Sequence, residues 1–292
     1  MDLAAIEADL KAAAGRRQIV EDYISPALVE RLAVTLESQA GRPKVGDRLP
    51  SGWHTIFCLQ APPRDALGLD GLPSGNELIP PVAMQRRMFG GARMTFHGAL
   101  VVGEPVRCES ELAETKTRTT PTAQLAIVTL RHRYFGSAGL AVVEEQDIIH
   151  MEPTGTAAER VASTVEVMPA PTWRRHMSPD PVMLFRFSAL TFNSHRIHYD
   201  APYSAEVERL PGLMVQGKLI ALQLLETVRA AVPSARLEMF EYRSGRPLFA
   251  SGRCALSAKL DETGRSVRLW AEDHKGLPVQ TASMTFSAPV SA

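Results

Sequence analysis

Alternating hydrophobic and polar positions occur in both halves of this 292-residue chain and predict two antiparallel sheets. In the first half, strand-like segments cover 92–103, 104–118, 123–137 and 140–153, with Gly or Pro between them. In the second half they cover 236–244, 247–261, 266–274 and 278–289. Two further apolar runs, 53–58 and 182–192, are also predicted as strands. Each half is therefore predicted to be a meander of strands.

Three helices are predicted between these strands. Residues 2–14 suit a short amphipathic helix that ends at Gly15, and residues 27–40 suit a second helix. Ser25 and Pro26 precede the second helix, as N-cap and first helical residue. The third helix lies within 211–232, where leucines recur along a long, mostly buried stripe before Pro233.

Two segments rich in Gly, Pro and small residues suggest how the chain is divided. Residues 61–91 form a long loop, which in a compact domain is usually functional or disordered. Residues 152–180 are rich in Pro, Thr, Ala and Ser and are predicted to connect two domains, 1–151 and 181–292. Each domain would wrap one helix in a curved antiparallel sheet, an α+β double hot-dog arrangement.

Composition narrows the class of protein. Lysine plus arginine equals aspartate plus glutamate, 32 each, which argues against a nucleic-acid partner held by phosphate contacts. Three cysteines without CxxC spacing predict reduced thiols in a cytoplasmic protein. The charged N-terminus lacks the apolar core of a signal peptide, and no run of 18 apolar residues predicts a membrane span.

The stretch 185–204, FRFSALTFNSHRIHYDAPYS, carries the candidate chemistry. Asn193, His195, His198 and Asp200 lie within eight residues of one another. His195, His198 and Asp200 have ligand types found in metal sites, but three residues of one loop rarely close such a site, so no metal is expected. His195 is as well explained by a structural hydrogen bond, and Asp200 by a turn.

This stretch resembles the signature of the MaoC-like enoyl-CoA hydratases, in which Asp, any residue, Asn, Pro, an aliphatic residue and His precede an Ala or Ser. Here Asn193 stands for the aspartate, His195 for the asparagine, Arg196 for the proline and His198 for the histidine, with Ser204 at the end. The stretch resembles a double hot-dog branch more closely: the mesaconyl-CoA and itaconyl-CoA hydratases and the mitochondrial-type 3-hydroxyacyl-thioester dehydratases. The resemblance extends to 88–104, 144–151 and 211–221.

The resemblance implies a cofactor-free hydro-lyase that adds water reversibly to a short α,β-unsaturated, dicarboxylic acyl-CoA. His198 would act as general base and acid, because a histidine gains and loses a proton near neutral pH. Asn193 would hold the attacking water. Gly217, near the start of the long helix, would donate its N–H to the thioester oxygen, with Gln216 as a neighbouring candidate. His195 and Arg196 are further candidates for substrate binding.

Arginines are candidates for the anionic groups of the substrate. Arg86, Arg87 and Arg93 flank Gly90–Gly91 and are predicted to bind CoA phosphates. Candidates for a substrate carboxylate are Arg64, Arg186, Arg196 and Arg243. The first half has no counterpart of Asn193 and His198, so one active site per chain is predicted, with the 61–91 loop over the substrate.

Two other activities remain open. A 3-hydroxyacyl-thioester dehydratase of fatty-acid synthesis would use the same residues on a longer acyl chain. A hot-dog thioesterase would use a carboxylate on the central helix, where Glu226 is the candidate but lies late in the helix. Because a double hot dog resembles the usual hot-dog dimer, the chain is expected to be a monomer or a homodimer.

Overall fold

The computed structural model describes residues 2–39, 41–73, 75–84, 86–121, 123–153, 167–250 and 252–291. Ten strands form one antiparallel sheet in the order β1-β3-β4-β5-β2-β7-β10-β9-β8-β6. The strands are β1 (Arg17–Tyr23), β2 (Arg86–Phe96), β3 (Pro105–Thr120), β4 (Ala123–Gly136), β5 (Gly139–Pro153), β6 (Trp173–Met177), β7 (Leu237–Ser244), β8 (Cys254–Leu260), β9 (Ser266–Glu272) and β10 (Pro278–Phe286).

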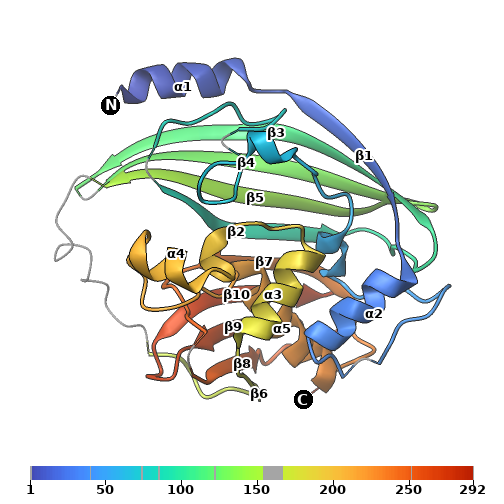
Figure 1. Cartoon of the computed structure of the whole chain (residues 1–292). Coiled ribbons are helices and arrows are strands. Elements are labelled where there is room, and N and C mark those ends of the chain that lie inside the picture. The colour runs from blue at the N-terminus through green and yellow to red at the C-terminus, as the bar shows by residue number, and fades with distance from the viewer. Residues whose placement is uncertain are drawn as a thin grey trace.

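The helices gather mainly on one side of this sheet (Figure 1). They are α1 (Leu3–Ala12), α2 (Pro26–Thr35), α3 (Pro181–Leu190), α4 (Ala201–Glu206) and α5 (Gly217–Ala231), with short 3₁₀ turns η1 (Trp53–Ile56), η2 (Arg64–Ala66) and η4 (Arg196–His198). Helix α5 packs against β6, β8, β9 and β10, so the second half of the sheet wraps it as predicted. Helix α2 packs chiefly against α3 and η1.

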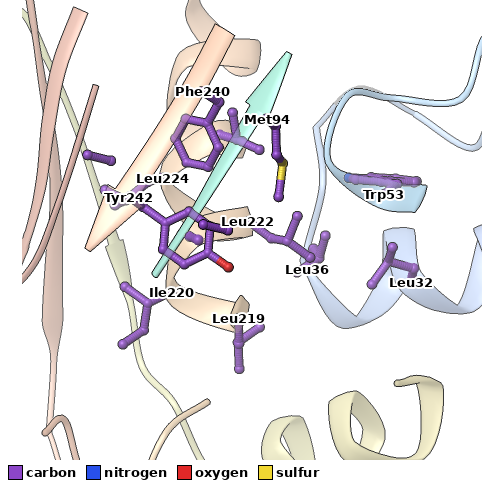
Figure 2. Packing of buried hydrophobic residues seen from close by; sticks show 14 of the residues in the cluster. Leu32, Leu36, Trp53, Met94, Leu219, Ile220, Leu222, Leu224, Phe240 and Tyr242 are labelled. Atoms are coloured by element: carbon purple, nitrogen blue, oxygen red, sulfur yellow. The ribbon is translucent and has the colours of Figure 1, made fainter. Parts of the chain in front are cut away.

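The two half-sheets join at β2 and β7. Met94 faces Phe240 and Ala92 faces Tyr242 across this junction. Figure 2 shows Phe240, Tyr242 and Met94 gathered with Leu222 and Leu224 of α5, and Trp53 with Leu32 on the side of α2. One hydrophobic cluster therefore spans both halves and contains α5.

Glycine at position 91 makes the junction possible. A Cβ there would lie 2.2 Å from the carbonyl oxygen of Tyr242, and the φ angle of Gly91 is +154°. Register also shifts between Phe89 and Gly91, so Gly90 is an extra residue in β2, a β-bulge. The Gly90–Gly91 pair thus serves strand pairing at the seam of the sheet.

Two predicted strands are wrong. Residues 53–56 form the 3₁₀ turn η1, because Gly52 has φ +89° and the Trp53 N–H donates to the Pro50 carbonyl at 3.0 Å. Residues 181–190 form helix α3, because Asp180 accepts the Met183 N–H at 2.7 Å and so caps a helix with Pro181 in its first turn.

Other predicted bounds need smaller corrections. Helix α2 ends at Thr35, and β2 begins at Arg86 within the predicted 61–91 loop. Strand β6, paired with β8, lies inside the stretch predicted as a connector. Residues 154–166 of that stretch lie outside the described residues. The division into two domains stays a prediction.

Candidate active site

The motif loop, residues 191–200, lies between α3 and α4. The N–H of Asn193 donates to the Ser188 carbonyl at 2.9 Å, which holds the loop against the end of α3. Its Oδ1 accepts the N–H of His195 at 3.1 Å. The Nδ2 group has no protein partner among the described residues, and it is therefore the part of Asn193 that remains for a water or a substrate.

His198 is buried, with 7% of its surface exposed, and its ring has a fixed tautomer. Nδ1 lies 2.7 Å from the carbonyl oxygen of Met214. A carbonyl can only accept, so Nδ1 carries the proton and Nε2 carries the lone pair. This tautomer makes Nε2 the basic nitrogen.

Burial also sets the charge of both motif histidines. Burial lowers the pKa of His198 to about 4. The hydrogen bond to Met214 raises this pKa and nearby His195 lowers it, but burial has the largest effect. Burial likewise lowers the pKa of His195, whose ring lies 5.4 Å from that of His198. His198 is therefore neutral near pH 7 and able to accept a proton.

The first turn of α5 presents free backbone N–H groups. Gly217 is the first helical residue, and Gln216, the N-cap, makes no side-chain cap bond. A Cβ at Gly217 would lie 3.0 Å from Ser244 Oγ, while its carbonyl accepts from Gln280 Nε2 at 3.0 Å. The helix dipole adds partial positive charge at this end, which suits an oxygen that gains negative charge.

Gln216 connects this helix start to the motif loop. Its Nε2 donates to the Leu184 carbonyl and to Ser188 Oγ, both at 3.0 Å. Because the Ser188 carbonyl also holds Asn193, α3 ties the positions of Asn193 and Gly217 together. The Gln216 side-chain nitrogen thus holds the start of α5 against α3.

The long loop of the first half is fastened to the motif loop. The N–H of Arg196 donates to the Asp70 carbonyl at 2.9 Å, and Ser194 Oγ donates to the Gly71 carbonyl. A Cβ at Gly71, where φ is +85°, would lie 2.0 Å from the Ser194 carbonyl oxygen, so only glycine fits this approach. Segment 69–73 is therefore held against the motif loop.

Arg196 and Asp200 mostly bond to the protein itself. Arg196 donates to Asp200 Oδ2 from Nε and Nη2, and to the Leu69 carbonyl from Nη1. Asp200 Oδ1 caps α4 by accepting the Tyr203 N–H at 3.1 Å. Ser204, the last motif residue, donates to the Gly212 carbonyl. These contacts give Arg196 and Asp200 a structural role, and substrate binding by Arg196 stays a prediction.

The arginines predicted for CoA do not share a surface. Arg87 and Phe89 face the interior of the sheet, and the bulge at Gly90 turns Arg93 to the opposite face. There Arg93 forms ion pairs with Glu145 and Asp147. Arg86 is exposed. The structure thus separates the three arginines and brings only Arg87 toward the motif loop.

The arginines predicted for a substrate carboxylate are also dispersed. Arg64 and Arg186 are exposed, and the Arg243 side chain is 79% exposed beside Glu241. Glu226, the thioesterase candidate, is buried and accepts from Trp53 Nε1, Ser38 Oγ and Arg229. It lies nine residues beyond Gly217, about 13 Å along the helix.

Two features of the site had no separate signal in the sequence. They are the Met214 carbonyl that fixes the His198 tautomer and the close approach of Gly71. His150, which lies beside Arg87 on the inner face of the sheet, was not singled out either. His150 lies in the segment 144–151 that carries part of the family resemblance, and that was the one available hint.

The described residues contain no group of three His, Cys, Asp or Glu side chains placed to share a metal ion. Within the same residues, no helix has the length and apolar character needed to cross a membrane.

Comparison with known sequences identifies relatives over nearly the whole chain. The model of the hydroxyacyl-thioester dehydratase type 2 family matches residues 52–250. A mesaconyl-C(4)-CoA hydratase of Chloroflexus aurantiacus is 38% identical over 278 residues, covering 95% of this chain and 98% of that protein. The mitochondrial hydroxyacyl-thioester dehydratase type 2 of Schizosaccharomyces pombe is 26% identical, covering 87% and 92%.

Solved structures agree on the fold. A MaoC-like dehydratase from Phytophthora capsici matches with a TM-score of 0.70 at 11% identity, covering 94% of this chain and 97% of that one. HtdX of Mycobacterium tuberculosis matches with a TM-score of 0.65 at 18% identity, covering 92% and 99%. They confirm the predicted α+β double hot-dog fold. With the family model and the 38% identical relative, the chain belongs to the hydroxyacyl-thioester dehydratase type 2 family of MaoC-like hydro-lyases.

Proposed function

We propose that this hydro-lyase reversibly adds water to a short, dicarboxylic α,β-unsaturated acyl-CoA of the mesaconyl-C4 or itaconyl type. The observation that carries the chemistry is the His198 ring, which the Met214 carbonyl holds with Nε2 as the basic nitrogen. The 38% identity to a mesaconyl-C(4)-CoA hydratase supports the acyl group. His198 and Asn193 are the proposed catalytic residues.

The reaction follows from these groups. Asn193 orients a water molecule, His198 Nε2 takes one of its protons, and the oxygen bonds to the β-carbon of the substrate. The electron pair of the double bond moves toward the thioester oxygen, which gains enolate charge. The backbone N–H of Gly217 donates to that oxygen, with the next N–H of the first turn beside it. The enolate then takes a proton at the α-carbon, which the imidazolium supplies.

One runner-up shares this machinery. A 3-hydroxyacyl-thioester dehydratase of fatty-acid synthesis is favoured by the family model and by the fission-yeast relative. It would accept acyl chains longer than four carbons. Thioester hydrolysis is less well supported, because Glu226 is engaged by three side chains far along α5.

A substrate panel tests the proposal. The protein is incubated with crotonyl-CoA, mesaconyl-C4-CoA and a long-chain trans-2-enoyl-CoA, while absorbance of the conjugated double bond and free thiol are followed. Fastest loss of absorbance with mesaconyl-C4-CoA and no thiol release supports the proposal. Preference for the long chain favours the dehydratase of fatty-acid synthesis. Thiol release in step with substrate loss would refute hydration.

Two further properties are proposed with this activity. A cytoplasmic location is supported by the three cysteines, none of which forms a disulfide. The chain works as a monomer or a homodimer, since its two half-sheets already pair side by side through β2 and β7.

A further inference from the structure

Arg87 is a half-buried arginine without a carboxylate partner. It lies on the inner face of β2, and its Nη1 donates to the Pro73 carbonyl at 2.8 Å. No ion pair to Arg87 occurs within 4.0 Å among the described residues. Burial lowers its pKa, and the charge of nearby Asp70 opposes this effect. A guanidinium held in the interior with one backbone hydrogen bond has several N–H donors left for an anion.

His150 faces Arg87 directly across the β2–β5 pair. It is buried, with 4% exposed, and its Nε2 has no hydrogen-bond partner among the described residues. Burial, and then the charge of Arg87, lower the pKa of His150 to about 4, so the ring is neutral near pH 7. A buried ring nitrogen without a partner costs free energy unless a ligand satisfies it. Arg87 therefore has unused N–H donors, and the unpartnered Nε2 of His150 beside it can also donate in the tautomer that carries its proton there.

This pair adjoins the catalytic loop through segment 69–73. Pro73 holds Arg87, while the carbonyls of Asp70 and Gly71 hold the motif loop. The charge of Arg87 also lowers the pKa of His195, whose ring stands edge-on to His198. The titratable groups around Arg87 are thus Asp70, His150 and His195.

Contacts along the inner face of β2 connect Arg87 to the first turn of α5. Phe89, two residues along the same inner face, stacks on Tyr242 at 6.0 Å between ring centroids. Lys218, the residue after Gly217, places its Nζ 5.4 Å from the centre of the Phe89 ring. Arg87 therefore lies on an inner face that reaches the first turn of α5 through Phe89 and Lys218, and segment 69–73 connects it to the motif loop.

We propose that Arg87, with His150 beside it, binds the free carboxylate of the substrate and so selects dicarboxylic acyl-CoA. This inference rests on the proposed function. In a diacid with a four-carbon main chain, three bonds separate the thioester carbon from the free carboxylate carbon, so the two ends must be held close together. The phosphates of CoA are separated from the thioester by the whole pantetheine arm. Arg87, which segment 69–73 connects to the motif loop, is therefore assigned to the carboxylate and not to the phosphates.

The experiment compares two substrates that differ in the carboxylate. Wild type, Arg87→Gln and Arg87→Lys are assayed with mesaconyl-C4-CoA and with crotonyl-CoA, which lacks the carboxylate. For Arg87→Gln we expect KM for mesaconyl-C4-CoA to rise about 10- to 100-fold, because a charge-assisted bond is lost. KM and kcat for crotonyl-CoA should stay within about twofold. Arg87→Lys should recover part of the loss, and His150→Phe should show a smaller loss of the same kind.

Arg107→Gln is the matched control. Arg107 is another arginine of the first half-sheet, paired with Glu109 and 41% exposed, and its loss should change neither substrate. Equal losses on both substrates in Arg87→Gln would overturn the inference, and would indicate a role in CoA binding or folding. An unchanged mesaconyl-C4-CoA constant would overturn it as well.

The activity of the wild-type protein shows whether the carboxylate assignment alone has failed or the proposed function as well. If wild type hydrates mesaconyl-C4-CoA and only the Arg87 result is negative, the carboxylate assignment alone is wrong. If wild type hydrates crotonyl-CoA but not mesaconyl-C4-CoA, the dicarboxylic substrate is wrong and the inference falls with it.

Discussion

The two halves of the sheet differ in how many charged and titratable side chains they bury on their inner faces. In the second half, the buried residues around α5 are mainly apolar, including Phe240, Leu256, Leu269 and Met284, with Gln280 as a buried polar exception. In the first half, the inner face buries a set of polar groups: Ser110, Glu144 and His150 on the strands and His54 on η1. The first half thus adds buried histidines and a carboxylate to an apolar core, whereas the second half packs its core around a helix.

The free-energy cost of burying polar groups explains why this difference matters. Burying apolar residues around α5 is favourable in free energy, and this packing fixes the first turn of α5 and the position of Gly217. Buried polar groups stabilise a fold only when they are paired. Glu144 is paired with His54 Nε2 at 3.1 Å and with Gln146, and its pKa falls to about 2 in spite of burial. His150 Nε2 and His132 Nε2 are not paired within the described residues, and in the second half Trp270 Nε1 and Gln280 Oε1 are unpaired as well. What distinguishes the first half is that its unpaired atoms include nitrogens of titratable rings.

The first test removes the catalytic base from the second half. His198→Ala should lower kcat for hydration by about 100- to 10,000-fold, because no other group of the motif has a basic nitrogen so placed. Stopped assays by mass spectrometry of the CoA esters measure this. His97→Ala, which removes an exposed histidine of the first half, should leave activity unchanged. Substantial hydration by His198→Ala would place the base elsewhere, with the first half as the next candidate.

The same comparison shows which parts of the fold the sequence predicts. Strands β3, β4 and β5 and helix α5 are long enough for their periodicity to be clear, and all were predicted. The runs 53–58 and 182–192 are short and apolar, so periodicity cannot separate helix from strand. The left-handed conformation of Gly52 leads into the 3₁₀ turn at 53–56, and the cap at Asp180 starts the helix at 181–190.

The candidate site also has a part that the sequence predicts and a part that it does not. A local motif placed His198 and Asn193 together, because both lie in one loop. The roles of the arginines depended on strand register, which the sequence does not reveal. Arg87 and Arg93 are six residues apart and would share a face of a regular strand, but the extra residue Gly90 turns them to opposite faces.

A second test isolates the backbone donor at the start of α5. Gly217→Pro removes one N–H at a helix position where proline is favoured, and Gln216 already has φ −64° and ψ 131°, which suits a residue before proline. We expect kcat to fall about 100- to 1,000-fold, as for the loss of an oxyanion donor. Gly217→Ala keeps the N–H and adds a Cβ 3.0 Å from Ser244 Oγ, so it controls for bulk. Equal losses in both variants would mean that crowding, and not the N–H, is responsible.

A third test compares one buried histidine from each half in acid. Burial lowers the pKa of His198 and of His150 to about 4, below the ordinary value of 6.5. The unfolded chain therefore binds more protons as pH falls from 6.5 to 4, and the folded state loses stability over that range. Each ring should contribute about 3 kcal/mol to this loss.

Urea unfolding at pH 7 and at pH 4.5 measures the effect. His198→Gln and His150→Gln should each lose less stability between the two pH values than wild type, whereas His97→Gln should lose as much. An identical acid sensitivity in all four proteins would mean that neither ring is held neutral by burial.

The smallest effect is expected at Asn193, in the loop that α3 and segment 69–73 hold between the halves. Asn193→Asp keeps an oxygen to accept the His195 N–H and replaces the Nδ2 donor by a second acceptor. We expect hydration to be retained or raised, within about tenfold of wild type, because the carboxylate adds a second base beside His198. Initial rates with mesaconyl-C4-CoA and crotonyl-CoA measure this, and Asn193→Leu, which removes both polar atoms, is the control. A collapse of Asn193→Asp to the level of Asn193→Leu would show that the reaction needs the N–H donor of the amide. The position of the water would then depend on a hydrogen bond that a carboxylate cannot make.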